Sequence, residues 1–200
     1  MRLQDNYINK LPHFYGFILV ILKQKNKLMK KILETERLVL REFSVDDAEF
    51  ILNLLNTPGW LEYIGDKNVR TAEDAVSYLE NGPIKSYKEN GFGLWKTLLK
   101  NKNTPIGMCG LINRESLEDI DIGFALLPEY SNFGYGYEIA RATMDYANDT
   151  LLINKVVAIT NSNNIRSIKL LNKLGLHFER EIKLSDDDSV LLFSPQNMKQ

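Results

Sequence analysis

The alternation of hydrophobic and polar residues in the first half of the chain predicts one strand followed by two helices. Residues 37–43 alternate apolar and polar side chains and are rich in β-formers, which is typical of a strand. Ser44 is placed to cap a helix that ends at the Thr-Pro-Gly sequence of residues 57–59. A second helix is predicted over residues 71–81; a Gly-Pro pair interrupts it, and the helical pattern can resume over residues 84–89.

The second half of the chain predicts a run of strands and then strands that alternate with helices. Three strand-like segments with polar connections predict an antiparallel meander over residues 93–99, 105–113 and 120–127. The remaining predicted elements are a long helix over 134–151, a buried strand over 156–160, a helix over 164–174 that Gly175 stops, and strands over 178–184 and 190–194. This order predicts an α/β domain with a mixed sheet and helices on its faces.

The N-terminal segment does not match the rest of the chain. Residues 11–22 form an apolar run that Pro12 and Gly16 interrupt, and the run is shorter than the roughly 20 residues that a membrane helix needs. A basic stretch follows without a small-residue cleavage site, which argues against a signal peptide. Two interpretations stay open: a hydrophobic helix that packs on the domain or on a partner, or a chain start that belongs at Met29. We therefore expect one domain over residues 30–200, an extension of uncertain status over residues 1–29, and no membrane partner.

Charge and cysteine content exclude several classes of partner. The chain has 25 basic and 26 acidic residues, so no global field would attract nucleic acid or an anionic membrane. Cys109 is the single cysteine, which excludes an internal disulfide and a cysteine-rich zinc site and fits a cytoplasmic protein. Its apolar flanks favour a small buried side chain over a nucleophile. Neither histidine has a partner at metal-ligand spacing, so we expect no metal. The choice between monomer and homodimer stays open.

Two glycines, Gly134 and Gly136, open the predicted long helix directly after a strand and a loop. Glycines let backbone N–H groups approach a ligand closely, and the unpaired N–H groups of a helix start suit a phosphate or pyrophosphate. A dinucleotide-binding turn would need a third glycine, and a nucleotide-hydrolysing phosphate loop would need Gly-Lys-Ser/Thr; both are absent. A tight turn without a ligand stays open for this segment alone. Glu138 follows in the first helical turn, where the helix dipole alone would stabilise a carboxylate, and we expect a structural role for it.

A second motif lies downstream, in the sequence N-S-N-N-I-R-S-I-K-L-L-N-K-L-G-L of residues 161–176. Together with the glycine turn it resembles the GNAT acyltransferase superfamily, and within it the branch that acetylates the N-termini of ribosomal proteins. Four segments carry this resemblance, in the family's order: T-E-R-L-V-L-R (35–41), G-F-A-L-L-P-E-Y (123–130), G-Y-G-Y-E (134–138), and N-I-R-S with K-L-G (164–167 and 173–175). The chain departs from the pattern at Ser131, where Gln or Arg is usual, at Asn132 and at Leu176, where an aromatic residue is usual.

The resemblance implies a GNAT fold, with a twisted, mostly antiparallel mixed sheet of about six or seven strands and helices on both faces. Two parallel strands, which end near Leu127 and Thr160, are expected to splay apart. Acetyl-CoA is implied as the acyl donor, with its pantetheine arm in the gap as a short β-addition. The resemblance assigns the pantetheine arm to Phe124, Leu126 and Leu127; the pyrophosphate to the amides of Phe133, Gly134, Tyr135, Gly136 and Tyr137; and the pantetheine or thioester end to Asn164 and Ser167.

The implied reaction is direct attack of a neutral primary amine on the thioester, without an acyl-enzyme. Catalysis then needs donors for the oxyanion, an acceptor for the amine proton and a donor for the departing thiolate. Backbone N–H groups near Leu126 and Leu127 are expected to stabilise the oxyanion. Leu171 stands where many superfamily members have a tyrosine acid, so Ser167 is the expected substitute. Asp119 and Asp121 lie on one face of the strand by alternation, and either could be the base, through a water, if that face borders the site; Asp121 is the expected one.

The leading hypothesis is therefore an acetyl-CoA-dependent N-acetyltransferase whose acceptor is a protein N-terminus or a small-molecule amine. Two alternatives stay open from the residues. The missing tyrosine and the uncertain base would also suit a non-catalytic acyl-CoA-binding or regulatory module. A nucleotide-binding regulator would use the same glycine turn.

Overall fold

The computed structural model describes residues 30–185 and 188–196. The chain divides into a unit of residues 1–30 and a compact unit, Lys31–Gln200, and the description below concerns the second. The predictions for residues 1–29 lie outside the described residues, as does part of the acidic turn near residue 186.

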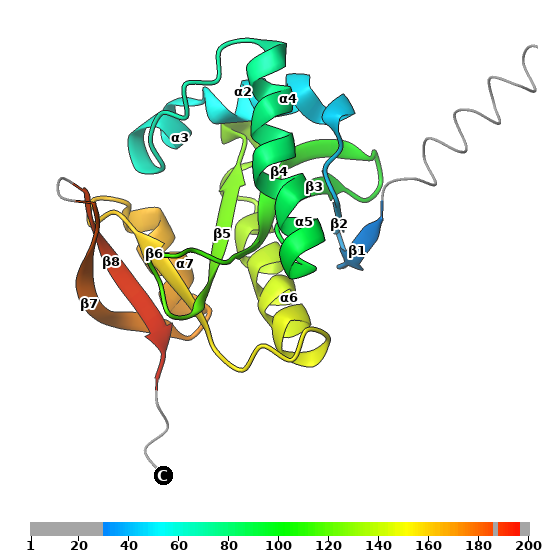
Figure 1. The fold of residues 1–200 in the computed structure, drawn as a ribbon. Coiled ribbons are helices and arrows are strands. Elements are labelled where there is room, and N and C mark those ends of the chain that lie inside the picture. The colour runs from blue at the N-terminus through cyan, green and yellow to red at the C-terminus, as the bar shows by residue number, and fades with distance from the viewer. Residues whose placement is uncertain (1–29, 186–187, 197–200) are drawn as a thin grey trace, which may run out of the picture. The chain divides into compact units, whose positions relative to one another are not determined.

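One mixed sheet forms the centre of this unit. It has eight strands in the order β1-β2-β3-β4-β5-β6-β8-β7 (Figure 1). Every neighbouring pair is antiparallel except β5 and β6, which run parallel. The strands are β1 (Lys31–Glu34), β2 (Leu38–Arg41), β3 (Leu94–Leu99), β4 (Thr104–Ile112), β5 (Ile120–Leu126), β6 (Val156–Thr160), β7 (Leu176–Ser185) and β8 (Asp188–Pro195). The predicted fold class and the antiparallel meander, β3-β4-β5, are confirmed.

The sheet has one strand more than the sequence predicted, and this strand is β1. Both of its ends, Lys31 and Glu34, are exposed, so its four residues carry little hydrophobic alternation. It is held by pairing with β2, where Leu33 lies opposite Leu40. Such a short edge strand is specified by its partner and not by its own pattern.

The described helices are α2 (Ala48–Leu55), α3 (Pro58–Tyr63), α4 (Ala72–Leu79), α5 (Lys85–Asn90), α6 (Tyr135–Asp149) and α7 (Ile165–Lys173). The sequence missed α3, because Pro58 looks like the end of α2. Pro58 instead occupies the first turn of α3, where its missing N–H costs nothing. Between α4 and α5 the chain does not break at Pro83 but widens into a π-helical turn, Glu80–Ile84. None of the described helices is long and apolar enough to cross a membrane.

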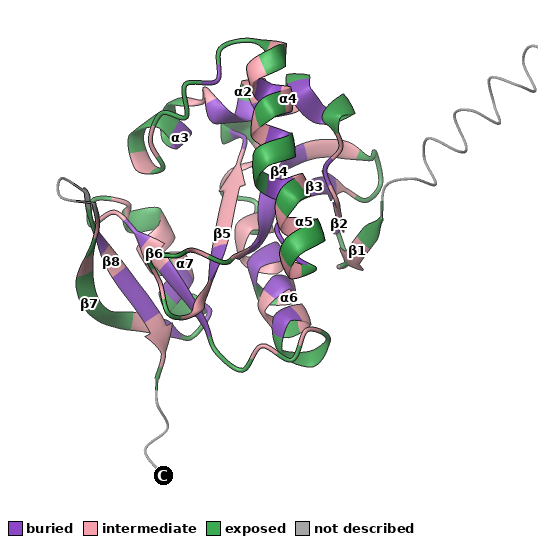
Figure 2. Ribbon diagram, in the orientation of Figure 1, coloured by how far each residue is buried: buried purple, intermediate pink, exposed green. Residues whose placement is uncertain are grey.

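Two hydrophobic clusters cover the two faces of the sheet, and Figure 2 shows the buried central strands between them. Residues of α6 and α7 pack in the first cluster, and residues of α2, α3 and α4 pack in the second. Strand β5 contributes to both by alternation: Ile122 and Phe124 belong to the first cluster, and Ala125 and Leu127, directly after the strand, to the second. We call these sides of the sheet the α6 face and the α4 face.

The parallel pair β5–β6 separates soon after it begins. Its register holds only Ile120 opposite Val156 and Asp121 opposite Val157. Beyond that point β5 pairs with β4 alone, and β6 continues along β8 (Figure 1). We call this separation the strand split, and residues 122–126, which have no strand partner on the β6 side, the open edge of β5. The splayed pair that the family resemblance implied is confirmed.

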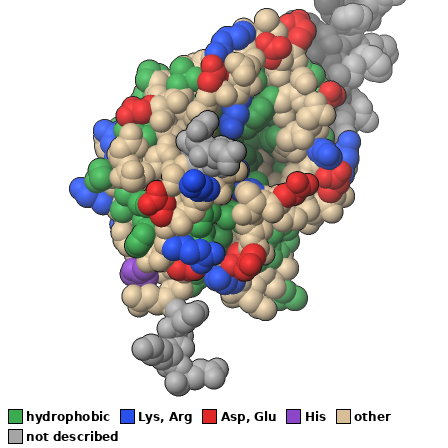
Figure 3. All heavy atoms as spheres, turned by 60° about the vertical axis from the view of Figure 1, so that its left-hand side comes forward, with side chains coloured by type: hydrophobic (Ala, Val, Ile, Leu, Met, Phe, Trp, Pro, Cys, Tyr) green, Lys and Arg blue, Asp and Glu red, His purple; other side chains and the backbone are tan. Residues whose placement is uncertain are grey.

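Side chains of both signs mix on the surface of the face drawn in Figure 3, where basic and acidic groups lie beside one another among hydrophobic ones. This distribution agrees with a formal net charge of −1.

Candidate active site at the strand split

The glycine turn, residues 131–137, leads from the end of β5 into α6. Gly134 caps the helix with φ +81°, a left-handed backbone conformation that favours glycine. The first intrahelical bond runs from the Glu138 N–H to the Gly134 carbonyl (3.1 Å), and the helix has no side-chain cap. The N–H groups of Tyr135, Gly136 and Tyr137 therefore precede the helical ladder. Three such donors at the positive end of a 15-residue helix suit an anion.

Gly136 marks the place where three elements meet. A Cβ atom at this position would lie 3.1 Å from Leu170 Cδ1 of α7 and 3.8 Å from Leu126 Cδ1 of β5. The start of α6 thus touches both the end of β5 and the flank of α7. The absence of a side chain at Gly136 allows this approach. The structure thereby brings together the three segments to which the sequence assigned the acyl-CoA site.

The open edge of β5 presents backbone groups in alternation. The Leu127 N–H donates to the Ile106 carbonyl of β4 (2.9 Å), so this amide is already paired. Alternate residues of a strand direct their N–H groups to opposite edges, which turns the Phe124 and Leu126 amides towards the open edge. The expectation that the Leu127 amide also faces the thioester is therefore corrected, because β4 takes that amide. Of the two amides that were expected to stabilise the oxyanion, only that of Leu126 faces the open edge.

Helix α7 carries the two polar residues that the second motif singled out. Asn164 caps the helix, and its Oδ1 accepts a hydrogen bond from the Ser167 N–H (3.1 Å). The half-buried Ser167 hydroxyl makes no hydrogen bond within the described part of the chain. Leu171, which stands at the position of the usual tyrosine, is buried in the cluster of the α6 face. The binding roles of Asn164 and Ser167, and the acid role of Ser167, stay predictions.

Asp121 lies at the closed end of the strand split, on the last β5 residue that pairs with β6. Its side chain is 1% exposed, and its carboxylate accepts from Arg114 Nε at 2.9 Å. Burial raises the pKa of the Asp121 carboxyl, against the opposing effect of the Arg114 charge. Alternation places Asp121 on the α4 face with Ala125, and the Arg114 charge also acts on Tyr78 of α4. The proposed role of Asp121 as a base stays a prediction.

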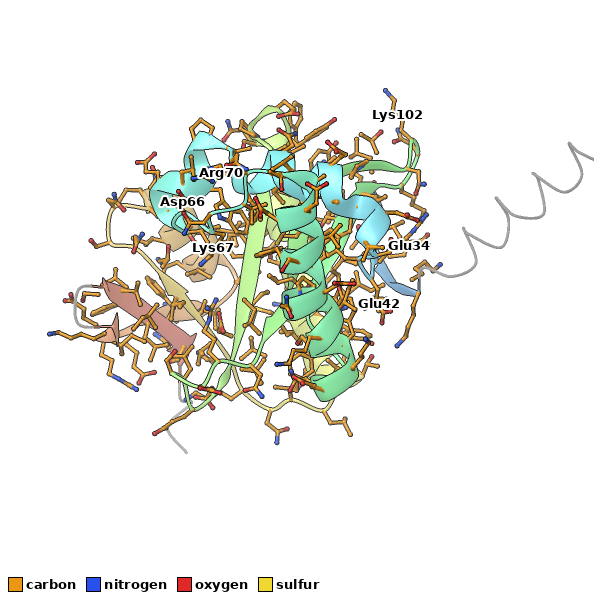
Figure 4. The ribbon with its side chains drawn as sticks, turned by 45° about the horizontal axis from the view of Figure 1, so that its top comes forward. Glu34, Glu42, Asp66, Lys67, Arg70 and Lys102 are labelled. Carbon is orange, nitrogen blue, oxygen red and sulfur yellow. The ribbon has the colours of Figure 1, made fainter. Side chains whose placement is uncertain are left out.

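The segment around α3 borders the end of β6. The Asn161 Nδ2 group, one residue beyond β6, donates to the Tyr63 carbonyl at the end of α3 (3.1 Å). The loop that follows α3 carries Asp66 and Arg70, which form an ion pair (Figure 4). The hydrogen bond from Arg70 holds the pKa of Asp66 below its ordinary value. No sequence motif indicated this connection, because it depends on a contact between residues 98 positions apart.

Cys109 lies away from the open backbone edge, in the core beneath Phe124. It is fully buried on β4 opposite Phe124, and its sulfur contacts the Thr143 hydroxyl at 3.4 Å. Burial raises the pKa of the thiol to about 12. The predicted buried role is confirmed, and a thiol that stays protonated at neutral pH is a poor nucleophile.

Two cations, neither of which the sequence pattern had singled out, flank the glycine turn. The Arg37 guanidinium lies over the Tyr135 ring (4.6 Å to the centroid). The Lys173 Nζ lies over the Tyr137 ring (4.0 Å). Both belong to segments of the family resemblance, but their spacing in the chain gives no sign that they meet at the same turn.

A sheet that opens beside the N-terminus of its longest described helix defines a class of α/β proteins whose geometry suits an extended ligand with an anionic group. The family model described as an acetyltransferase (GNAT) domain matches residues 37–177. The chain belongs to the GNAT acetyltransferase family, and it is an acyltransferase.

Known relatives agree with this assignment. The uncharacterised N-acetyltransferase YoaA of Bacillus subtilis is 27% identical over 155 residues, which cover 76% of this chain and 85% of the relative. The solved ribosomal-protein-S5-alanine acetyltransferase of Vibrio fischeri has the same fold, with a TM-score of 0.69 and 22% identity over 84% of this chain and 97% of that one. RimL, a ribosomal L7/L12 α-N-protein acetyltransferase solved in complex with coenzyme A, gives a TM-score of 0.71 and 16% identity over 82% of this chain and 97% of its own.

Proposed function

We propose that this enzyme transfers an acetyl group from acetyl-CoA to a primary amine. The observation that carries the proposal is the strand split beside the glycine turn, which places an unpaired strand edge next to free helix N-terminal amides. An acyl-CoA has a matching shape, because its amide-containing pantetheine arm ends in a diphosphate. The similarity in fold to RimL, which was solved with coenzyme A, supports this donor.

The donor would be held mainly by backbone. The amides of Tyr135, Gly136 and Tyr137 point out of α6 and suit the diphosphate. The outward N–H group of Leu126, beside the glycine turn, would pair with a pantetheine amide as in an added strand. A side-chain departure such as Ser131 costs little affinity in such a site, because neither set of contacts depends on it.

Three groups around the strand split would each serve one step of the reaction. The Phe124 amide, which also faces the open edge but lies further from the glycine turn, donates to the oxyanion that develops as the amine nitrogen bonds to the thioester carbon. Asp121, through a water, accepts the proton that the amine loses. As the carbon–sulfur bond breaks, the Ser167 hydroxyl donates a hydrogen bond to the thiolate and passes a proton to it from solvent. Attack is direct, so the Cys109 thiol takes no part.

The amine would approach from the α4 face. Helices α6 and α7 cover the other face, where the donor is held. Asp121 projects to the α4 face beside Arg114, and the Tyr63–Asn161 contact borders the end of β6 on the same route. A protein N-terminus or a small-molecule amine fits this arrangement.

The test combines binding with turnover. Coenzyme A should raise the melting temperature of the protein, and acetyl-CoA should release free thiol steadily with at least one member of a panel of peptides with free N-termini, amino sugars and polyamines. Mass spectrometry of the product should show one added acetyl group on the amine. Tight coenzyme A binding without turnover on any amine would contradict the enzyme and favour a binding module. Stabilisation by ATP but not by coenzyme A would contradict the donor site.

A further inference from the structure

Glu138, in the first turn of α6, is tied to the connection between β1 and β2. Its Oε1 accepts from the Thr35 hydroxyl (2.6 Å) and the Arg37 N–H (2.9 Å), and its Oε2 accepts from Arg37 Nε (2.6 Å). Burial alone would raise the pKa of Glu138, but the hydrogen bonds from Thr35 and Arg37 outweigh it and hold the pKa below its ordinary value. The carboxylate therefore serves as more than a partner for the helix dipole. It fastens α6 to a distant part of the chain.

Arg37, which binds Glu138, also contacts residues of the glycine turn. Its Nη1 donates to the Phe133 carbonyl (3.0 Å), and its guanidinium lies over the Tyr135 ring. Its Nη2 would lie 3.5 Å from a Cβ atom at Gly134, and it has no hydrogen-bond acceptor among the described residues. One planar side chain thus contacts Phe133 and Tyr135 and lies beside Gly134, while it holds Glu138.

The backbone conformation of the glycine turn depends on stabilising contacts of this kind. Residues on both sides of Phe133 adopt left-handed conformations, Asn132 with φ +67° and Gly134 with φ +81°. Asn pays a small cost there, and the conformation persists only where contacts enforce it. The family's usual Gln or Arg at the start of the turn is also replaced by Ser131. Arg37 brings a permanent guanidinium to the same turn from the connection between β1 and β2.

We propose that Arg37 is a positioning residue of the acyl-CoA site. Its guanidinium joins Glu138 to the Phe133 carbonyl and thereby holds the amides of residues 135–137 in the arrangement that receives the diphosphate. The segments that begin at Thr35 and at Gly134 then act together to shape the diphosphate site. This inference rests on the proposed donor.

The decisive comparison uses two acyl donors that differ in the diphosphate. Arg37→Met should raise the KM for acetyl-CoA and the Kd for coenzyme A by about tenfold to a hundredfold, the scale of a lost charge-assisted contact. The kcat at saturating acetyl-CoA should stay near the wild-type value. The KM for S-acetyl-pantetheine, which has no diphosphate, should not change. Arg41→Met is the matched control, because Arg41 lies in the adjacent strand β2 and, within the part of the chain that the structure describes, donates only to Asn103 (2.6 Å). This variant should behave as the wild type.

Two conservative variants keep the test sharp if Arg37→Met folds poorly. Arg37→Lys keeps the charge but cannot hold Glu138 and the Phe133 carbonyl at once, so its KM for acetyl-CoA should stay close to that of Arg37→Met. Glu138→Gln should raise this KM severalfold.

Two results would overturn the inference. One is a wild-type KM for acetyl-CoA in either Arg37 variant, and the other is a KM for S-acetyl-pantetheine that rises as much as the KM for acetyl-CoA. A wild-type protein that binds no coenzyme A would instead overturn the proposed donor, and this inference with it.

Discussion

The two faces of the strand split differ in how they are built. On the α6 face the glycine turn, α6 and α7 meet at Gly136, and the proposed donor contacts are backbone amides in one short stretch of chain. On the α4 face the candidate residues come from separate elements: Asp121 from β5, Arg114 from the β4–β5 connection and Tyr63 from α3. Backbone sites are specified by local turn chemistry, whereas side-chain sites depend on tertiary contacts. Because of this difference, the acyl donor can be proposed by name, whereas the amine acceptor can be proposed only as a class.

The largest expected effect is on the α6 face. Gly134→Glu places a strained side chain and a negative charge at the left-handed cap of α6, where the diphosphate should sit. The Kd for coenzyme A should weaken by about a thousandfold, since several charge-assisted contacts are lost at once, and thermal stabilisation by coenzyme A should disappear. Gly91→Glu is the matched control, because Gly91 is also left-handed (φ +76°) but caps α5. Equal responses of the two variants to coenzyme A would contradict the placement of the site.

The next largest effect concerns Asp121 on the α4 face, where a substitution should change catalysis but not donor binding. Asp121→Asn should lower kcat by about a hundredfold, the contribution of one general base, and leave the Kd for coenzyme A unchanged. Because burial raises the pKa of Asp121 and the base must be ionised, the acidic limb of the kcat/KM profile should lie above the usual carboxyl range. Asp145→Asn, on the exposed flank of α6, is the control. Full activity in Asp121→Asn would remove Asp121 from the mechanism.

A smaller effect tests the junction at Gly136. Gly136→Val would press against Leu170 of α7, whose Cδ1 already lies 3.1 Å from the position of an added Cβ. The KM for acetyl-CoA should rise by about tenfold, since overpacking of this size costs about 1–3 kcal/mol. Adding Leu170→Ala should recover most of the loss. No recovery would mean that α7 does not set the geometry of the turn.

The smallest effect on activity concerns Cys109. Cys109→Ala removes a buried sulfur and should lower the free energy of unfolding by about 1 kcal/mol, as small core truncations do. The kcat should stay within about twofold of the wild type, a change below the 1.4 kcal/mol that a tenfold effect requires. Intact-protein mass spectrometry of the wild-type protein after acetyl-CoA addition should show no acetyl-enzyme. An acetylated Cys109 would replace direct attack by a two-step route.

The sequence predicted the glycine turn from a local pattern, and the strand split only through the family resemblance. The alternation of β5, the glycines before α6 and the cap at Asn164 are readable within a few residues. It missed α3, because a proline that starts a helix looks like one that ends a helix. It also missed the joint role of Arg37 and Glu138, which are 101 positions apart and meet only in the fold.

The expected pair of oxyanion donors shows the same limit at the level of single atoms. The sequence placed Leu126 and Leu127 together at the end of β5. The hydrogen bond from the Leu127 amide to Ile106 then separated them, because neighbouring strand residues point to opposite edges. The register with β4 decides which amide is free, and that register is a tertiary property.

A crystal structure of the protein with coenzyme A tests the central claim most directly. We predict the diphosphate at the amides of residues 135–137 and the pantetheine arm along the open edge of β5, with its thiol near Phe124, at the end of the arm away from the glycine turn. Coenzyme A bound elsewhere, or β5 and β6 paired along their whole length in the complex, would contradict the account.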